Sequence, residues 1–136
     1  RLQRLLGSGG MGEVWLAQSS ADAPWVAIKL IRTHLSSRVL SERLARERDI
    51  LKRLRHPGIA ALLDSGLSEE GEPFLVLEYV EGQALLEAAA QRGWDLAQKL
   101  RVFAAIADAV AAAQSHLIVH RDLKPANILI DAAGRP

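Results

Sequence analysis

The spacing of the apolar residues changes near Glu81 and Gly82, and this change limits the possible folds. Before it, short β-branched and apolar runs predict strands over residues 2–6, 14–17, 25–31, 61–65 and 73–80. A charged segment over residues 38–55 has a helical period and interrupts these strands. After it, residues 84–91 and 95–115 read as helices. We therefore expect an α+β chain with a strand-rich part, residues 1–80, and a helical part, residues 81–136.

The second predicted helix carries a start signal and an apolar stripe. Asp95 and Gln98 have the spacing of a capping box, in which each side chain bonds the backbone of the other. Five apolar residues then recur on one stripe: Leu96, Leu100, Phe103, Ala107 and Val110.

Composition excludes several classes of protein. The chain has 136 residues, 49% hydrophobic and 24% charged, which is typical of a globular protein. Its 17 basic and 16 acidic residues nearly cancel, which argues against a nucleic-acid partner. The absence of cysteine excludes disulfides and thiol nucleophiles and fits a reducing compartment. No apolar run approaches the roughly 18 residues of a bilayer span, so we expect no membrane segment in this chain. We expect it to be cytoplasmic, or to be a cytoplasmic domain of a larger protein.

A glycine cluster near the start could serve phosphate binding. Residues 7–12 read GSGGMG and contain the pattern G-x-G-x-x-G, which lets backbone N–H groups approach phosphate oxygens. A dinucleotide-binding turn requires a helix next, whereas residues 13–16 look like a strand. A Walker-type loop requires Gly-Lys-Ser/Thr, whereas Gly12 precedes Glu13. A phosphate-covering strand–loop–strand flap and a glycine-rich hairpin without a ligand both remain open.

A lysine and a glutamate occupy inward-facing positions. Lys29 lies in the run 25–31 and could be an edge lysine whose stem reaches water. In the segment 38–55, one helical face carries four leucines and Glu47. A carboxylate there is costly unless it is paired, which makes Lys29 its obvious partner.

Polar residues of several types gather between two apolar runs in the segment 118–130, IVHRDLKPANILI. Pro125 prevents a continuing helix, and residues 128–130 resume as a strand. Asp122 can accept a proton, Lys124 can neutralise an anion, and the Asn127 carbonyl oxygen can bind a hard cation.

This loop resembles a known signature. His120-Arg121-Asp122-Leu123 with Asn127 is similar to the catalytic loop of eukaryotic-type (Hanks-type) protein kinases, and the neighbouring Lys-Pro-Ala-Asn resembles the bacterial serine/threonine branch. Other segments resemble the glycine-rich loop (7–14), the third-strand lysine motif (26–29), the helix αC glutamate (Glu47) and the gatekeeper and hinge (77–80). The resemblance implies an N-lobe, residues 1–80, with an antiparallel five-stranded sheet and helix αC. It also implies a partial, mainly helical C-lobe, residues 81–136.

The resemblance further implies ATP, Mg²⁺ and a protein substrate with a serine or threonine hydroxyl. Glu47 would hold Lys29 against the α- and β-phosphates, Asp122 would accept the hydroxyl proton, and Asn127 would bind Mg²⁺. Lys124 would lie near the γ-phosphate, and His120 would organise the backbone of the loop. The residues implied to contact the nucleotide are Gly7, Ser8, Gly9, Gly10, Met11, Gly12, Val14, Ala27, Lys29, Leu77, Glu78, Val80 and Leu129.

The family's Asp-Phe-Gly and Ala-Pro-Glu motifs do not occur in these 136 residues. We therefore expect a truncated piece of a kinase domain, marginally stable and without useful activity by itself. A small-molecule phosphotransferase of kinase-like fold is one alternative, against which Arg121 and Lys124 weigh. A non-catalytic pseudokinase or truncated binding module is another. The presence of Lys29, Glu47, Asp122 and Asn127 argues against a decayed active site.

Overall fold

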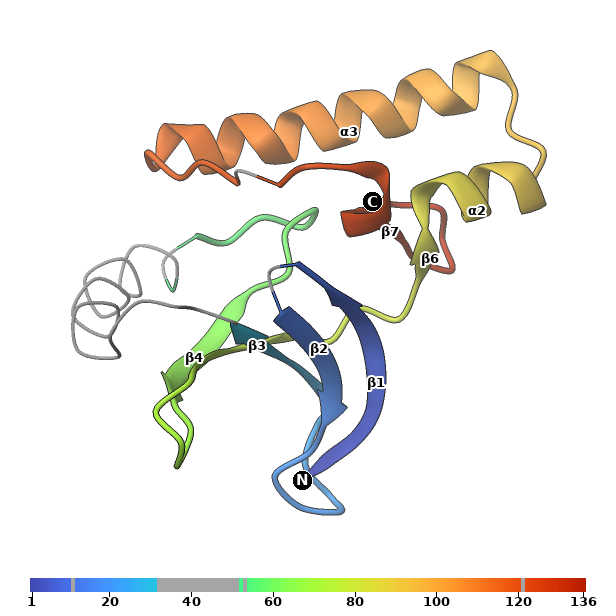
Figure 1. Cartoon of the computed structure of the whole chain (residues 1–136). Coiled ribbons are helices and arrows are strands. Elements are labelled where there is room, and N and C mark those ends of the chain that lie inside the picture. Colours follow the sequence, from blue (N-terminus) through green and yellow to red (C-terminus); the bar gives the residue numbers. More distant parts are fainter. Residues whose placement is uncertain (11, 32–51, 53, 121) are drawn as a thin grey trace. The chain divides into compact units, whose positions relative to one another are not determined.

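A computed structural model describes the chain except for residues 11, 32–51, 53 and 121 (Figure 1). Most of the helix expected over residues 38–55 therefore lies outside the described residues, as do Met11, Glu47 and Arg121. The chain divides into two compact units, considered separately below. The first unit comprises residues 1–55 and 60–79, and the second comprises residues 56–59 and 80–136.

The first unit is built on a five-stranded sheet in the described part of the chain (Figure 1). Its strands are β1 (Leu2–Gly9), β2 (Gly12–Ala17), β3 (Val26–Ile31), β4 (Leu62–Leu67) and β5 (Pro73–Glu78). They lie in the order β1-β2-β3-β5-β4, and all neighbours are antiparallel. The predicted antiparallel five-stranded sheet is thus confirmed.

The strand ends differ from the sequence prediction in the glycine cluster. Strand β1 was expected to end at Leu6, but it continues to Gly9 because the hairpin keeps pairing. Ser8 lies opposite Glu13, and Gly9 lies opposite Gly12. The glycine cluster is therefore the closed tip of a hairpin whose strands run into it from both sides.

The second unit joins short strands to helices. Strand β6 (Gln83–Ala84) pairs antiparallel with β7 (Leu129–Ile130). Helices α2 (Leu85–Gln91) and α3 (Leu96–Ser115) follow β6, and a 3₁₀ turn, η1 (Pro125–Asn127), precedes β7. Strand β6 was not predicted, because two residues are too few to show an alternating pattern.

Helix α3 begins with the predicted capping box. Gln98 N donates to Asp95 Oδ1 at 2.7 Å, and Asp95 N donates to Gln98 Oε1 at 2.9 Å. The helix ends in a Schellman motif: Ile118 N donates to Ala113 O at 3.0 Å, and Leu117 N donates to Gln114 O at 2.8 Å. This motif needs a left-handed residue, and Leu117 occupies that position with φ 60°.

A small apolar core holds the second unit together. Ala88, Val102 and Ile130 are buried, and Leu85, Trp94, Ile106 and Ile128 pack around them. Helix α3 thus enters this core through Val102 and Ile106. The first three residues of the predicted apolar stripe, Leu96, Leu100 and Phe103, are exposed instead. In the described part of the chain, no helix combines the length and hydropathy needed to cross a bilayer.

Candidate functional site

The loop after α3 is organised around Asp122. Its backbone N–H donates to His120 Nδ1 at 3.3 Å. His120 therefore supports the backbone of the loop in this structure, in the manner expected from the sequence. Arg121, between them, lies outside the described residues.

Two oxygens of Asp122 receive hydrogen bonds from its neighbours. Lys124 Nζ lies 3.1 Å from Asp122 Oδ2, and Asn127 Nδ2 donates to the same oxygen at 2.9 Å. Asn127 Nδ2 also donates to the Asp122 carbonyl oxygen at 2.7 Å. Among the described residues, no hydrogen bond reaches Asp122 Oδ1. The carboxylate is thus held by one oxygen, and the other can accept a proton from a bound molecule.

The same contacts set the charge of Asp122. The hydrogen bond from Lys124, followed by that from Asn127, lowers the pKa of the Asp122 carboxyl below its ordinary value. Asp122 is therefore ionised at neutral pH, as a proton acceptor must be.

Asn127 is placed by the 3₁₀ turn η1. Pro125 starts this turn, where its missing N–H costs nothing, and Asn127 N donates to Lys124 O at 2.9 Å. Because its side-chain nitrogen donates to Asp122, the Asn127 amide oxygen keeps its lone pairs for a cation. Among the described residues, no group of three or more acidic, histidine or cysteine side chains could hold a metal ion. The loop thus offers part of a cation site.

In the first unit, the strand register brings several predicted site residues onto one face of the sheet. Val14 of β2 lies opposite Lys29 of β3, and Ala27 of β3 lies opposite Leu77 of β5. Directly opposite residues in an antiparallel pair share a face, and so do residues two apart in one strand. Val14, Ala27, Lys29 and Leu77 therefore share one face. Glu47, the expected partner of Lys29, lies outside the described residues.

The glycines at the hairpin tip are not required by the packing of the chain. A Cβ atom on Gly7, Gly9 or Gly10 would meet nothing within 4 Å. Of the described glycines in the cluster, Gly12 has a positive φ, 131°. A hairpin alone would thus need glycine only at that position. The open space beside the other three leaves room for a ligand to approach the backbone closely.

The residues predicted to form the hinge divide between the two units. Glu78 N donates to Ala61 O at 2.8 Å, so this N–H is not available to a ligand. Val80 and Leu129 belong to the second unit, where Leu129 pairs with Ala84.

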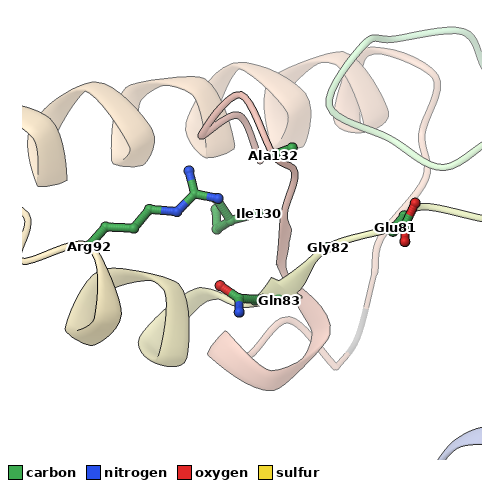
Figure 2. Close-up of a pocket in the computed structure, with 6 residues that line it drawn as sticks. All are labelled: Glu81, Gly82, Gln83, Arg92, Ile130 and Ala132. Atoms are coloured by element: carbon green, nitrogen blue, oxygen red, sulfur yellow. The ribbon is translucent and has the colours of Figure 1, made fainter.

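One pocket in the second unit does not involve the predicted site (Figure 2). Its volume is about 290 Å³. It is lined by Glu81, Gly82, Gln83, Arg92, Ile130 and Ala132. Sequence analysis singled out none of these residues as functional. Position 82 requires glycine for a structural reason, because a Cβ there would lie 2.7 Å from the Ile130 carbonyl oxygen.

Known proteins resemble the chain along nearly its whole length. The family model "Protein kinase domain" matches residues 1–135. Serine/threonine-protein kinase pkn2 of Myxococcus xanthus is 35% identical over 99% of this chain and 16% of its own length. Serine/threonine-protein kinase PknA of Mycobacterium tuberculosis is 38% identical over 99% of this chain and 33% of its own length. The crystal structure of the M. tuberculosis PknI kinase domain matches with a TM-score of 0.78 and 29% identity.

The chain spans 53% of the PknI structure and covers 96% of its own length in that match. It therefore corresponds to about half of that kinase domain and to a third or less of the two curated relatives. The glycine-rich hairpin, the strand lysine and the loop around Asp122 all fall within the matched residues. The chain is a partial kinase domain and belongs to the protein kinase domain family, with serine/threonine kinases among its relatives.

Proposed function

We propose that this chain contributes the nucleotide-binding part and the catalytic loop of a serine/threonine protein kinase. Residues 1–80 would form its N-lobe and residues 81–136 the first part of its C-lobe. The observation that carries the proposal is the state of Asp122. Its carboxylate has a lowered pKa, one oxygen is held by Lys124 and Asn127, and no hydrogen bond from the described residues reaches the other oxygen.

In this proposal Asp122 Oδ1 accepts the proton of a serine or threonine hydroxyl. The hydroxyl oxygen forms a bond to the γ-phosphorus while the bond from phosphorus to the β,γ-bridging oxygen breaks. Lys124 would offset negative charge on the transferred group. ATP supplies that group, and Mg²⁺ neutralises phosphate charge when bound.

The first unit supports the nucleotide role. Val14, Ala27 and Leu77 supply apolar surface on the same sheet face as Lys29. The open backbone of Gly7, Gly9 and Gly10 suits phosphate oxygens, and Lys29 with Glu47 would hold the α- and β-phosphates. The other hairpin residues, Ser8, Met11 and Gly12, would complete the phosphate-covering loop. The backbones of Glu78 and Val80 would bind the adenine edge, with Leu129 against the ring.

The Asn127 amide oxygen would supply one Mg²⁺ ligand. The Asp-Phe-Gly aspartate, which supplies another in this family, is not in the sequence. We therefore expect the 136-residue polypeptide by itself to transfer no phosphate above the level of its own Asp122→Asn variant. Transfer well above that level would contradict this expectation.

We further propose a cytoplasmic site of action and no nucleic-acid partner. The absence of cysteine fits a reducing compartment, and the formal net charge of +1 offers no strong attraction for phosphate backbones.

The decisive experiment substitutes Asp122→Asn in the full-length protein. Because the amide cannot accept the hydroxyl proton, we expect kcat on a protein substrate to fall about 10²–10⁴-fold. ATP affinity should remain unchanged. Asp22→Asn, an exposed aspartate in a loop of the first unit, is the matched control and should keep full activity. An unchanged kcat in Asp122→Asn would refute the proposed role. Transfer to small hydroxyl compounds in place of proteins would favour a small-molecule phosphotransferase.

A further inference from the structure

Strand β5 ends at Glu78, and the side chain of this residue takes part in the pairing with the chain before β4. Leu62 and Leu77 are the last paired residues of the two strands at this end, so Ala61 and Glu78 are the next to meet. Glu78 N donates to Ala61 O at 2.8 Å, as in a regular antiparallel pair. Ala61 N, however, donates to Glu78 Oε2 at 3.2 Å.

The Glu78 carboxylate thus takes the place of a main-chain acceptor. In a regular hydrogen-bonded pair the two residues exchange both N–H···O bonds, so Ala61 N would donate to the Glu78 carbonyl oxygen. Here the Ala61 N–H is already satisfied by the side chain. The Glu78 carbonyl oxygen is therefore spared the bond that Ala61 would otherwise make to it.

The side chain of Glu78 begins on the face of the sheet opposite to Lys29. Leu77 lies opposite Ala27 and shares the face of Lys29, and successive residues of a strand point to opposite faces. Glu78 is the next residue, and it is exposed. Its influence on a nucleotide bound beside Lys29 would therefore pass through its own backbone, without a direct contact of the carboxylate.

We propose that Glu78 is a positioning residue, whose carboxylate binds the Ala61 N–H and so keeps the Glu78 carbonyl oxygen available to the amino group of adenine. This inference rests on the proposed function, in which the Glu78 backbone binds the adenine edge. Without the carboxylate, the Ala61 N–H would turn to the carbonyl oxygen and compete with the adenine amino group for it. Because a carbonyl oxygen has two lone pairs, the bond to adenine would be weakened and not abolished.

Binding of two nucleotides to the full-length protein tests this proposal. Purine riboside triphosphate lacks the amino group of ATP and is otherwise the same, so the ratio of its Kd to that of ATP measures recognition of this group. In Glu78→Ala we expect the ratio to fall about threefold, part of the effect of losing one hydrogen bond.

Two further variants separate the hydrogen bond from the charge. Glu78→Gln keeps an acceptor oxygen at the same reach and should retain the wild-type ratio. Glu78→Asp keeps the charge but is shorter by one methylene group, so it should behave like Glu78→Ala. Glu70→Ala, which removes an exposed glutamate between β4 and β5, is the control and should leave the ratio unchanged.

An unchanged ratio in Glu78→Ala would overturn the proposal, including the case in which both nucleotides bind more weakly by the same factor. A wild-type ratio in Glu78→Asp with a lowered ratio in Glu78→Gln would also overturn it, because charge would then be the source of the effect.

NMR of the nucleotide-free protein identifies the acceptor directly, through the scalar coupling across a hydrogen bond. We expect Ala61 N to couple to the side-chain carboxyl carbon of Glu78 in the wild type, and to the main-chain carbonyl carbon of position 78 in Glu78→Ala. Coupling to the main-chain carbonyl carbon in the wild type would contradict the positioning role alone, since no nucleotide is involved. Equal binding of the two triphosphates by the wild type would contradict the adenine contact of the proposed function, and the positioning role with it.

Discussion

At the scale of single residues, Asp122 shows how one carboxylate can be both held and available. Lys124 and Asn127 donate to Oδ2, and the same bonds that orient the group also lower its pKa. Its folded-state pKa lies below its unfolded value of about 3.9. These contacts therefore stabilise the fold above that value, and their contribution is lost as the pH falls through the folded pKa.

The Lys124→Met variant should raise the pKa of Asp122. Lys124 makes the largest contribution to the lowered pKa, so its removal should shift the carboxyl titration upward, more than Asn127→Ala does. In the full-length protein, the acidic limb of the phosphate-transfer activity profile should move to higher pH in the same order. Carbon NMR of the Asp122 carboxyl measures the pKa directly. Lys99→Met is the control, and an unshifted titration in Lys124→Met would contradict the assignment.

Two glycines give opposite expectations for substitution by alanine. At Gly82 the new methyl group would lie 2.7 Å from the Ile130 carbonyl oxygen, so Gly82→Ala should destabilise the fold by about 1–3 kcal/mol. At Gly9 the space is open, so Gly9→Ala should leave stability equal or slightly higher and weaken ATP binding. Denaturant unfolding and nucleotide titration separate the two effects. An ATP affinity unaffected by Gly9→Ala would count against the phosphate-binding role.

The site residues were predictable from the sequence to different degrees. The loop around Asp122 is local, and its mixture of an acid, a lysine, a proline and an asparagine within a few positions is recognisable without a structure. The contact of His56 Nε2 with Asp108 Oδ2, which lie 3.1 Å apart, is not recognisable in this way. It joins residues 52 positions apart, and neither one departs from an ordinary surface pattern. The Lys29–Glu47 pair stays a prediction, since Glu47 lies outside the described residues.

At the scale of elements, helix α3 shows where sequence signals are strong and where they fail. Its start was predictable, because Asp95 and Gln98 satisfy a local rule that needs no tertiary contact. Its buried face was not, because partners from β7 and α2 select Val102 and Ile106 over the longer stripe that begins at Leu96. Strand β1 ends later than predicted for a similar reason, since its pairing with β2 continues beyond the apolar run.

One substitution at the end of α3 should stabilise the fold. Leu117 adopts φ 60° and is 93% exposed. Its left-handed backbone conformation therefore costs free energy that burial of its side chain does not offset. Leu117→Gly should therefore raise the free energy of unfolding by about 0.5–1 kcal/mol, the relief of strain exceeding the entropy that glycine adds to the unfolded chain. Thermal unfolding measures this, with Gln114→Gly as a control that should destabilise the helix. A lower stability in Leu117→Gly would contradict the strain argument.

At the scale of the whole chain, the two units were only partly foreseen. The change of periodicity near residue 81 indicated a division close to the passage after Tyr79. No pattern indicated that residues 56–59 lie with the helical part, since a four-residue turn has no periodicity of its own. The family itself was visible in motifs, because catalytic loops keep their chemistry within short segments.

The 136-residue polypeptide should associate through the exposed face of α3. Leu96, Leu100 and Phe103 lie at helical spacing and are 72%, 58% and 69% exposed. Phe103→Glu should reduce association, measured by sedimentation velocity over a range of concentrations. Gln114→Glu adds the same charge elsewhere on the helix and should have little effect. Equal behaviour of the two variants would show that charge, and not the apolar face, governs association.

Residues 56–59 belong to the second unit although the chain on both sides of them belongs to the first, and His56 Nε2 lies 3.1 Å from Asp108 Oδ2 on α3. This arrangement limits where the gene can be divided to express the two units separately. A clone ending after Tyr79 would encode the five strands of the first unit but also residues 56–59 without α3, so His56 would lose its contact with Asp108. A clone beginning at Val80 would encode α3 with Asp108 but without His56, which contacts it. Dividing the gene at a single position would thus place His56 and Asp108 on different products, and neither product could form the contact between them.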